Sequence, residues 1–151
     1  MRGIRLGIFS YRIVSDMFEL IEEINSVLVF YTCPTKSNNK DGFVTIMDET
    51  LSSHGPDVMW KWVIDADGFG IAQAREIPLT ILIIDLIMTK YANGLTQVEI
   101  ANPTWQVRGM LLIIKSFLDE TVIGKIRIRE EPVDYENRFY TDEDLKWDKP
   151  P

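Results

Sequence analysis

Residues 59–65 read MWKWVID, residues 95–100 read LTQVEI, and residues 126–129 read IRIR. Each run is rich in β-branched or aromatic residues or alternates with a period of two, which is typical of β-strands. Apolar runs of helical length lie between them, so the order strand, helix, strand, helix, strand is predicted. Two successive crossovers of this kind place neighbouring strands in parallel. The fold class that we expect is α/β, with a mixed, largely parallel sheet and crossover helices.

The two crossovers have distinct helix signals. The first runs from residue 71 to 91 and is interrupted by Pro78. Its apolar side chains point in nearly every direction around a helix, so we expect it to be buried on most sides. Asn93 and Gly94 end it, since both tolerate the left-handed backbone of a helix C-terminus. The second crossover follows the capping residue Thr104 and presents a wide apolar face.

The N-terminal part of the chain predicts shorter elements. Residues 4–13 fit a strand or the start of a helix, and the pattern does not choose between them. Residues 16–25 predict a helix with one apolar side, and residues 27–32 predict a strand. A polar loop leads to a second expected strand at residues 43–47. The two strands are expected to form a hairpin, and a short helix is expected before residue 58.

The length, composition and charge of the chain limit the classes of protein to which it can belong. The 151 residues, 46% of them hydrophobic and 11% aromatic, fit one domain with a real core. A formal net charge of −7 argues against nucleic acid, and it favours a transient and largely apolar contact with membranes over permanent residence on an anionic one. Residues 77–88 are too short for a membrane span and include Asp85. Cytoplasmic localisation is therefore expected.

The charge is concentrated near the C-terminus. Residues 130–151 hold eight acidic and three basic residues, which gives a net charge of −5. The expected organisation is a single domain over residues 1–129 and an acidic, aromatic-containing tail over residues 130–151. The tail fits either a segment that packs on its own domain or a peptide reserved for a partner.

The motif Asp65-Ala66-Asp67-Gly68-Phe69-Gly70 follows directly on the first strand and has three interpretations. A strand-end Asp-x-Asp-Gly is typical of haloacid dehalogenase-type phosphatases, but Phe69 stands where threonine or valine is usual. Together with Glu76, the motif also matches the spacing of a calcium-binding EF-hand loop, although a strand precedes it. The third interpretation, which we favour, is structural: Asp65 ends a buried strand and Gly68 makes the turn.

Other residues offer little support for catalysis. His54 is the only histidine and lies in a Gly-Pro loop, where we expect it to be exposed. Cys33 is the only cysteine and is expected to be a small buried hydrophobe. Asp85 lies within an apolar helix and is expected to face solvent. We therefore predict no enzyme, no catalytic or metal-binding residues and no cofactor.

Three segments occur in a defined order: VIDADGF at 63–69, YANGL at 91–95 with VEIANP at 98–103, and a helix over 105–118 followed by Lys125-Ile126. Their order and spacing resemble the CRAL-TRIO domain, the lipid-pocket domain of retinaldehyde-binding and yeast phosphatidylinositol-transfer proteins. In that family, the third segment is the gate helix, which ends in Phe-Leu and is followed by Lys-Ile.

The resemblance implies a pocket for a lipid or another hydrophobic small molecule under the gate helix. The residues expected to line it are Trp105, Met110, Ile113, Ile114, Phe117 and Val122. Lys125 occupies the position where some members keep a lysine for the headgroup. Ala92 and Asn93 replace the family's turn proline and the acidic residue that contacts inositol in some members, so phosphatidylinositol is not the expected ligand.

A second function stays open. The region around Trp105 and Arg108 also resembles the divergent subclass found in some Rho GTPase-activating proteins, whose members bind small GTPases. The alternative is therefore a protein-interaction module of the same fold, with its cavity filled by its own side chains. A continuous cavity of at least ~300 Å³ would favour a ligand, and a solid interior would favour the module.

Overall fold

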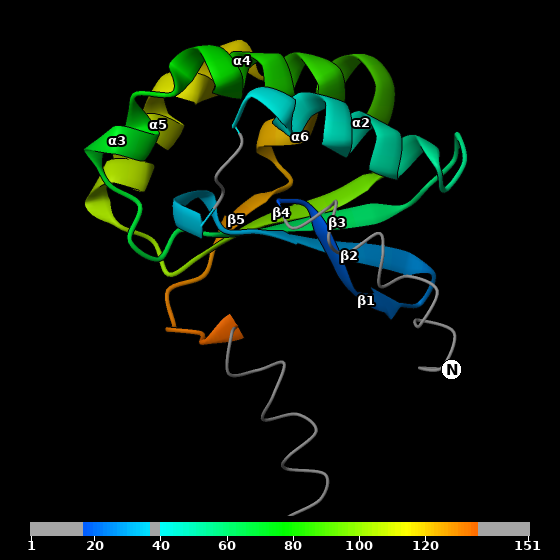
Figure 1. Cartoon of the computed structure of the whole chain (residues 1–151), viewed down its shortest axis with the longest axis horizontal. Helices are drawn as coiled ribbons and strands as arrows, with labels where there is room; N and C mark the ends of the chain where they lie inside the picture. Colours follow the sequence, from blue (N-terminus) through cyan, green and yellow to red (C-terminus); the bar gives the residue numbers. More distant parts are fainter. Residues whose placement is uncertain (1–16, 37–39, 136–151) are drawn as a thin grey trace, which may run out of the picture.

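The computed structural model describes residues 17–36 and 40–135, which form a five-stranded sheet with helices on one face (Figure 1). The strands are β1 (Glu19–Ile24), β2 (Val27–Thr32), β3 (Trp60–Asp65), β4 (Leu95–Ala101) and β5 (Ile126–Ile128). They lie in the order β1-β2-β3-β4-β5. β1 and β2 are antiparallel, and the other neighbouring pairs are parallel. The predicted α/β class with a mixed, largely parallel sheet is confirmed.

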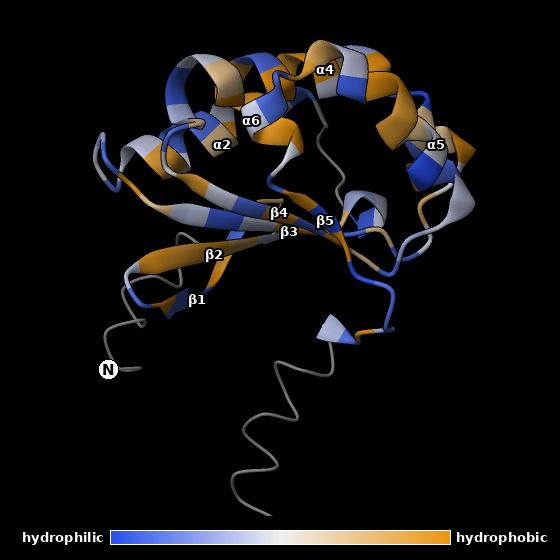
Figure 2. Ribbon diagram, turned by 180° about the vertical axis from the view of Figure 1, so that it is seen from behind, coloured by the Kyte–Doolittle hydropathy of each residue, from blue (hydrophilic) through white to orange (hydrophobic). Residues whose placement is uncertain are grey.

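Helices fill the connections between the strands. They are α2 (Phe43–Ser52), α3 (Ile71–Ala74), α4 (Ile77–Leu86), α5 (Trp105–Ile114) and α6 (Glu120–Ile123), with short helical turns η2 (Pro34–Lys36), η3 (Lys40–Gly42), η4 (Ile87–Tyr91) and η5 (Lys115–Phe117). Helices α2 to α6 all lie on the same face of the sheet, whereas the chain after β5 passes to the other face (Figures 1 and 2).

Among the N-terminal predictions, the strand at residues 27–32 is confirmed, and the short helix expected before residue 58 is partly confirmed because α2 extends to Ser52. The helix at residues 16–25 and the strand at residues 43–47 are wrong. In place of a helix, residues 19–24 form β1, which pairs with β2. Asn25 and Ser26 both have positive φ, as a two-residue hairpin turn requires, and this local signal outweighs the apolar spacing. Residues 43–52 form α2 because Phe43, Met47 and Leu51 recur every four residues and are all buried. Residues 4–13 lie outside the described residues.

The crossover predictions agree better with the structure. Pro78 occupies the first turn of α4, where its missing N–H is tolerated, and the break between α3 and α4 lies just before it. Thr104 caps α5 by accepting a hydrogen bond from the Val107 backbone N–H at 3.2 Å. Asp85 is exposed, as predicted. The expectation that the first crossover is buried on most sides is wrong, because Leu82 is 57% exposed.

Gly94 is required for a different reason from the one predicted. Neither Asn93 nor Gly94 has a positive φ. Instead, a Cβ atom at Gly94 would collide with the carbonyl oxygen of Val58, and the Trp60 backbone N–H donates to the Gly94 carbonyl at 2.8 Å. The glycine therefore allows the turn after η4 to lie directly against the start of β3.

The sheet has an apolar core on each face. The larger core lies under the helices and centres on the aromatic side chains Phe18, Phe30, Trp60 and Trp62. The smaller one, on the opposite face, includes Val29, Tyr31, Cys33, Val63, Ala101 and Tyr135. The prediction that Cys33 is a buried hydrophobe is confirmed. Among the described residues, no helix is long and apolar enough to cross a membrane.

Candidate ligand-binding site

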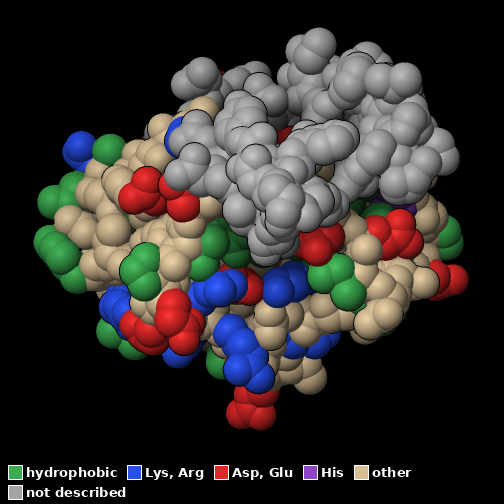
Figure 3. Space-filling model, turned by 90° about the horizontal axis from the view of Figure 1, so that it is seen from below, with side chains coloured by type: hydrophobic (Ala, Val, Ile, Leu, Met, Phe, Trp, Pro, Cys, Tyr) green, Lys and Arg blue, Asp and Glu red, His purple; other side chains and the backbone are tan. Residues whose placement is uncertain are grey.

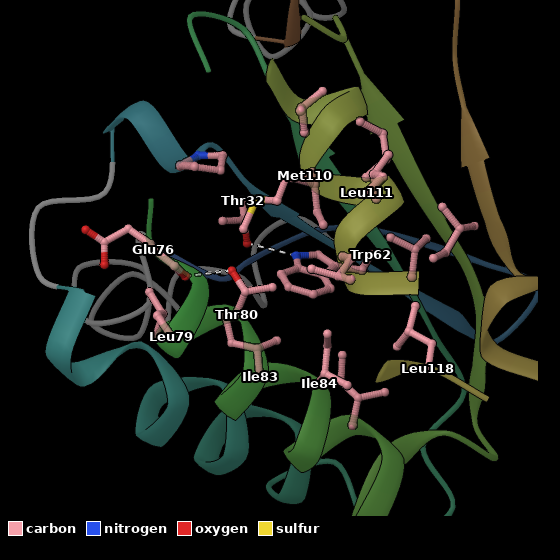
Figure 4. Close-up of a pocket in the computed structure, with 18 of the residues that line it drawn as sticks. Thr32, Trp62, Glu76, Leu79, Thr80, Ile83, Ile84, Met110, Leu111 and Leu118 are labelled. Atoms are coloured by element: carbon pink, nitrogen blue, oxygen red, sulfur yellow. Dashed lines mark hydrogen bonds between the residues drawn. The ribbon is translucent and has the colours of Figure 1, made fainter. Parts of the chain in front are cut away.

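A cavity of about 180 Å³ lies between the sheet, α4 and α5 (Figure 4). Its floor consists of residues that point to the helical side of the sheet, among them Trp62 and Ile64 of β3, and Val98 and Ile100 of β4. Because side chains alternate along a strand, these positions share one face. The cavity therefore opens within the larger core, below the two helices that cover it.

The walls of the cavity come from the inward stripes of α4 and α5. Leu79, Thr80, Ile83 and Ile84 of α4 line one side, and Val107, Met110, Leu111 and Ile114 of α5 line the other. Both sets recur at spacings of three and four residues, which place them on one side of a helix. Figure 4 shows Met110 and Leu111 on one wall and Thr80, Ile83 and Ile84 on the other, with Trp62 between them.

Three polar side chains of the lining donate to oxygen atoms of the protein. The indole N–H of Trp62 donates to Thr32 Oγ1 at 2.9 Å, and the Thr32 hydroxyl donates to the Met17 carbonyl at 2.7 Å. The Thr80 hydroxyl donates to the Glu76 carbonyl at 2.9 Å. Satisfied polar groups do not demand water, so the cavity is suited to an apolar occupant.

The structure separates the predicted site residues into two groups. Met110, Ile114 and Val122 line the cavity. Trp105, Ile113 and Phe117 do not, and their side chains are 72%, 55% and 49% exposed. The sequence could not distinguish the two groups because α5 is apolar on both sides. The α4 wall and the strand floor were not predicted, although the spacing of apolar residues in α4 could have indicated the wall.

Lys125 also lies outside the cavity lining. Its ammonium donates to the Ala92 carbonyl at 2.8 Å, just past the end of η4. A cation there interacts favourably with the carbonyl end of a helix. The lysine therefore links the start of β5 to the end of the first crossover, and the headgroup position that the resemblance implies is not part of this cavity.

Several apolar side chains of α5 and of the following turn η5 do not line the cavity and are exposed. We call Trp105, Leu112, Ile113 and Phe117 the outer ridge; their side chains are between 49% and 73% exposed. Leu82, on the outer side of α4, is 57% exposed as well. Figure 2 shows both helices coloured as hydrophobic over much of their length. Large exposed apolar patches are typical of contact surfaces.

Asp65, which opens the acidic motif, has a structural environment. Its carboxylate is buried and accepts hydrogen bonds from the Tyr31 hydroxyl at 2.7 Å, the Asn102 amide at 2.9 Å and the Asp67 backbone N–H at 3.1 Å. Burial and the bond to Asp65 raise the pKa of Tyr31 far above its usual value, so the phenol stays protonated. The carboxylate therefore serves as an acceptor that holds the end of β3.

The calcium-loop interpretation of this motif does not fit the structure. A calcium loop would bring Asp65 and Glu76 together, but Glu76 lines the cavity whereas Asp65 binds Tyr31 in the core of the opposite face. In residues 17–36 and 40–135, no group of acidic, histidine or cysteine side chains is arranged to hold a metal ion. Gly68 has a positive φ, as the structural interpretation predicts. His54 is exposed, as predicted.

The segment after β5 is tied to the face of the sheet opposite the helices. The side-chain amide of Asn102 donates to the Val133 carbonyl at 2.7 Å, and its oxygen accepts from the Val133 N–H at 2.9 Å. Tyr135 is 2% exposed and donates to Glu99 Oε2 at 2.9 Å. Residues 130–135 thus pack on the domain. The rest of the acidic tail lies outside the described residues, and the boundary after Arg129 stays a prediction.

Glu99 forms ion pairs with two basic side chains on this face of the sheet. It pairs with Lys61 at 3.0 Å and with Arg129 at 3.5 Å. Burial acts to raise the pKa of Glu99, but the bonds from Lys61 and Tyr135 and the charge of Arg129 outweigh it and hold the pKa below its usual value. Figure 3 shows basic side chains gathered near the middle of this face with acidic ones around them.

Comparison with known proteins agrees with this architecture. The sequence pattern of the CRAL/TRIO domain matches residues 41–143, about two thirds of the chain. The crystal structure of Sfh5 has a similar fold, with a TM-score of 0.52 and 21% sequence identity over 74% of this chain. The match spans 46% of the Sfh5 chain, so this chain corresponds to about half of that protein. No curated protein matches by sequence. The chain therefore belongs to the CRAL/TRIO domain family, whose members in general bind or transfer lipids or other hydrophobic molecules and are generally not enzymes.

Proposed function

We propose that the domain binds a hydrophobic molecule in the cavity between the sheet, α4 and α5, and transfers it between membranes. The observation that supports this most directly is the cavity itself, about 180 Å³ of space with an almost wholly apolar lining. Protein interiors are otherwise close-packed, with few voids larger than a water molecule. An apolar ligand in such a void gains dispersion contacts that the lining side chains lack when it is empty.

The ligand contacts that we propose differ from those expected from the sequence. Met110, Ile114 and Val122 are retained, since all three line the cavity. Ile83 of α4 and Trp62 of β3 are added because they face the same space from the other helix and from the floor. For the outer ridge we propose contact with the surroundings of the protein, and not with the bound molecule.

The size of the cavity limits how a ligand enters. At about 180 Å³ it is smaller than the ~300 Å³ that drug-sized ligands occupy at the least, but the interior is not solid. An apolar cavity of about 150 Å³ is large enough to bind benzene. We infer that the space seen here accepts part of an acyl chain or a single ring system, and that a longer ligand separates α4 from α5.

The outer ridge supports a transient contact with membranes during loading. Large apolar side chains such as Trp105 and Leu112 insert into the interfacial layer of a bilayer at a gain set by the area they bury. A net charge of −7 disfavours strongly anionic surfaces, so we propose contact with zwitterionic membranes. We infer a cytosolic protein, because the single cysteine is buried and free.

A cavity-filling substitution tests the proposal. Val107 lines the cavity from α5, so Val107→Phe fills part of the space and is expected to reduce bound lipid several-fold. The measurement is native mass spectrometry of protein purified from cells, followed by extraction and identification of the lipid. Ile24→Phe is the control, because Ile24 is 49% exposed and belongs neither to the cavity lining nor to the outer ridge. Wild-type protein that contains no co-purifying lipid and takes none up from vesicles would contradict the proposed function.

One observation favours a second function, a protein-interaction module. The outer ridge is an exposed apolar surface of the kind that also binds proteins, and small GTPases are the partner class implied by the sequence resemblance. Pull-downs with wild-type and Trp105→Ala protein separate the two possibilities. A stoichiometric GTPase that is lost in the variant supports the module. Recovery of no stoichiometric protein counts against it.

A further inference from the structure

The cavity lining is almost free of charge. Among the lining residues, all of which lie in the described part of the chain, Glu76 is the one with a charged side chain, and none is lysine, arginine or histidine. Phosphate and carboxylate groups are held in proteins by such cations, by side-chain or backbone N–H groups, or by metal ions. The lining therefore provides no positive side chain for the headgroup of an anionic lipid.

Side-chain hydrogen-bond donors in the cavity are almost all in use. The Trp62 indole, the Thr32 hydroxyl and the Thr80 hydroxyl each donate to a protein oxygen at 2.7–2.9 Å. The amide of Gln73, whose oxygen accepts from the Gly70 N–H at 2.8 Å, is the one further side-chain donor among the described lining residues. Hydroxyl oxygens keep lone pairs after donating, so the lining offers acceptors more readily than donors.

Three lysines of the described chain already have oxygen partners. Lys125 donates to the Ala92 carbonyl at 2.8 Å, and Lys90 pairs with Asp48 at 2.9 Å. Lys61 pairs with Glu99 at 3.0 Å, and Glu99 in turn accepts a hydrogen bond from Tyr135, which belongs to the apolar core of the opposite face. Moving any of these ammonium groups into the cavity would break a bond that it already makes. Reorganisation of a nearby lysine is therefore an unfavourable way to bind an anion.

We propose that the cavity selects an uncharged lipid, a hydrocarbon chain or ring system that ends in at most one hydroxyl group, over a fatty-acid carboxylate or a lipid phosphate. This inference rests on the proposed function and specifies its ligand class. An ionised group placed in an apolar cavity without a partner pays a large desolvation penalty, and the lining supplies no cation to offset it. A ligand hydroxyl can instead donate to Thr80 Oγ1.

Two ligands of equal chain length test the proposal on the wild-type protein. Decan-1-ol and decanoate are titrated at pH 7.4 into protein with ¹³C-labelled methionine methyl groups. Met110 lines the cavity, so its methyl resonance reports binding, whereas the 46% exposed Met59 serves as the internal control. Decan-1-ol is expected to bind about tenfold or more tightly than decanoate. The free-energy difference that corresponds to this ratio is a modest fraction of the full cost of burying a charge.

Two charge substitutions in the first crossover, one at the cavity and one at an exposed position, provide a further test. Glu76→Lys and Asp85→Lys change the net charge equally, but only Glu76 lines the cavity, since Asp85 is exposed. Glu76→Lys is expected to reduce or reverse the preference for the alcohol, and Asp85→Lys to leave it unchanged. Equal or tighter binding of decanoate by the wild type would overturn the inference and leave the proposed function intact. A Met110 resonance that responds to neither ligand, nor to decane, would overturn both.

Discussion

Gly94 lies against the carbonyl oxygen of Val58, and this contact sets how the first crossover returns to the sheet. A side chain at this position would meet backbone atoms, which cannot rotate away as a flexible side chain can. Gly109, in the middle of α5, has open space where its Cβ would be. The two glycines therefore differ in kind: the first is required by a close approach, and the second only lowers the helix propensity of its element.

Substitution of each glycine by alanine should change stability in opposite directions. Gly94→Ala is expected to lower the free energy of unfolding by about 1–3 kcal/mol, because the backbone must shift to relieve the collision. Gly109→Ala is expected to raise it by about 0.5–1 kcal/mol. Urea denaturation of the two variants provides the measurement. Equal effects of the two substitutions would show that the contact with Val58 is not a constraint.

The structural roles of some residues could be predicted from the sequence, and those of others could not. Asp65 and Gly68 follow the structural interpretation of their motif, because a strand that ends in a carboxylate and a glycine turn is a local arrangement. The role of Asn102 could not be predicted. Its side chain bonds Val133, which is 31 residues away, and such pairing depends on the path of the chain after β5.

At the scale of elements, α5 shows what apolar spacing can and cannot determine. The sequence located this helix and its cap, because Thr104 and the apolar repeat are local signals. It did not determine which side faces the sheet. Leu111 and Leu112 are adjacent and chemically identical, yet they are 7% and 73% exposed. When both sides of a helix are apolar, only the packing partners decide its rotation.

These two leucines therefore provide a matched test of the outer ridge. Leu111→Ala is expected to cost about 2–5 kcal/mol of stability, because it removes buried methyl groups beside a cavity. Leu112→Ala is expected to change stability by less than about 0.5 kcal/mol and to weaken binding to phosphatidylcholine vesicles. Chemical denaturation and vesicle sedimentation measure the two effects. Unchanged vesicle binding by Leu112→Ala and Trp105→Ala proteins would exclude the ridge as the membrane contact.

At the scale of the whole molecule, the two faces of the sheet are stabilised differently. Helices cover one face through apolar packing. On the other face, the segment after β5 packs against the smaller apolar core and is also held by hydrogen bonds to Asn102 and Glu99. Sequence alternation predicted the parallel arrangement of β3, β4 and β5, because buried crossovers leave a strong pattern. The contacts of the second face join distant residues of unremarkable composition, so they could not be foreseen.

Acid should weaken this second face. The folded pKa of Glu99 lies below its unfolded value, which is about 4.3. Its contribution to stability is therefore complete above the unfolded pKa and is lost as the pH falls through the folded pKa. Glu99→Gln should lower stability at pH 7 and flatten its decline below about pH 4. Unfolding midpoints from pH 3 to 7 measure this, with the exposed Glu23→Gln as control. Identical acid profiles for wild-type and Glu99→Gln proteins would contradict the assignment.

The strands of the sheet lie side by side in the same order in which they occur along the chain. Each new strand can therefore join the edge left by its predecessor as the polypeptide leaves the ribosome, without waiting for a later one to be inserted between them. The α4 wall of the cavity emerges before α5 does. The cavity is therefore completed only when the second crossover packs against the sheet.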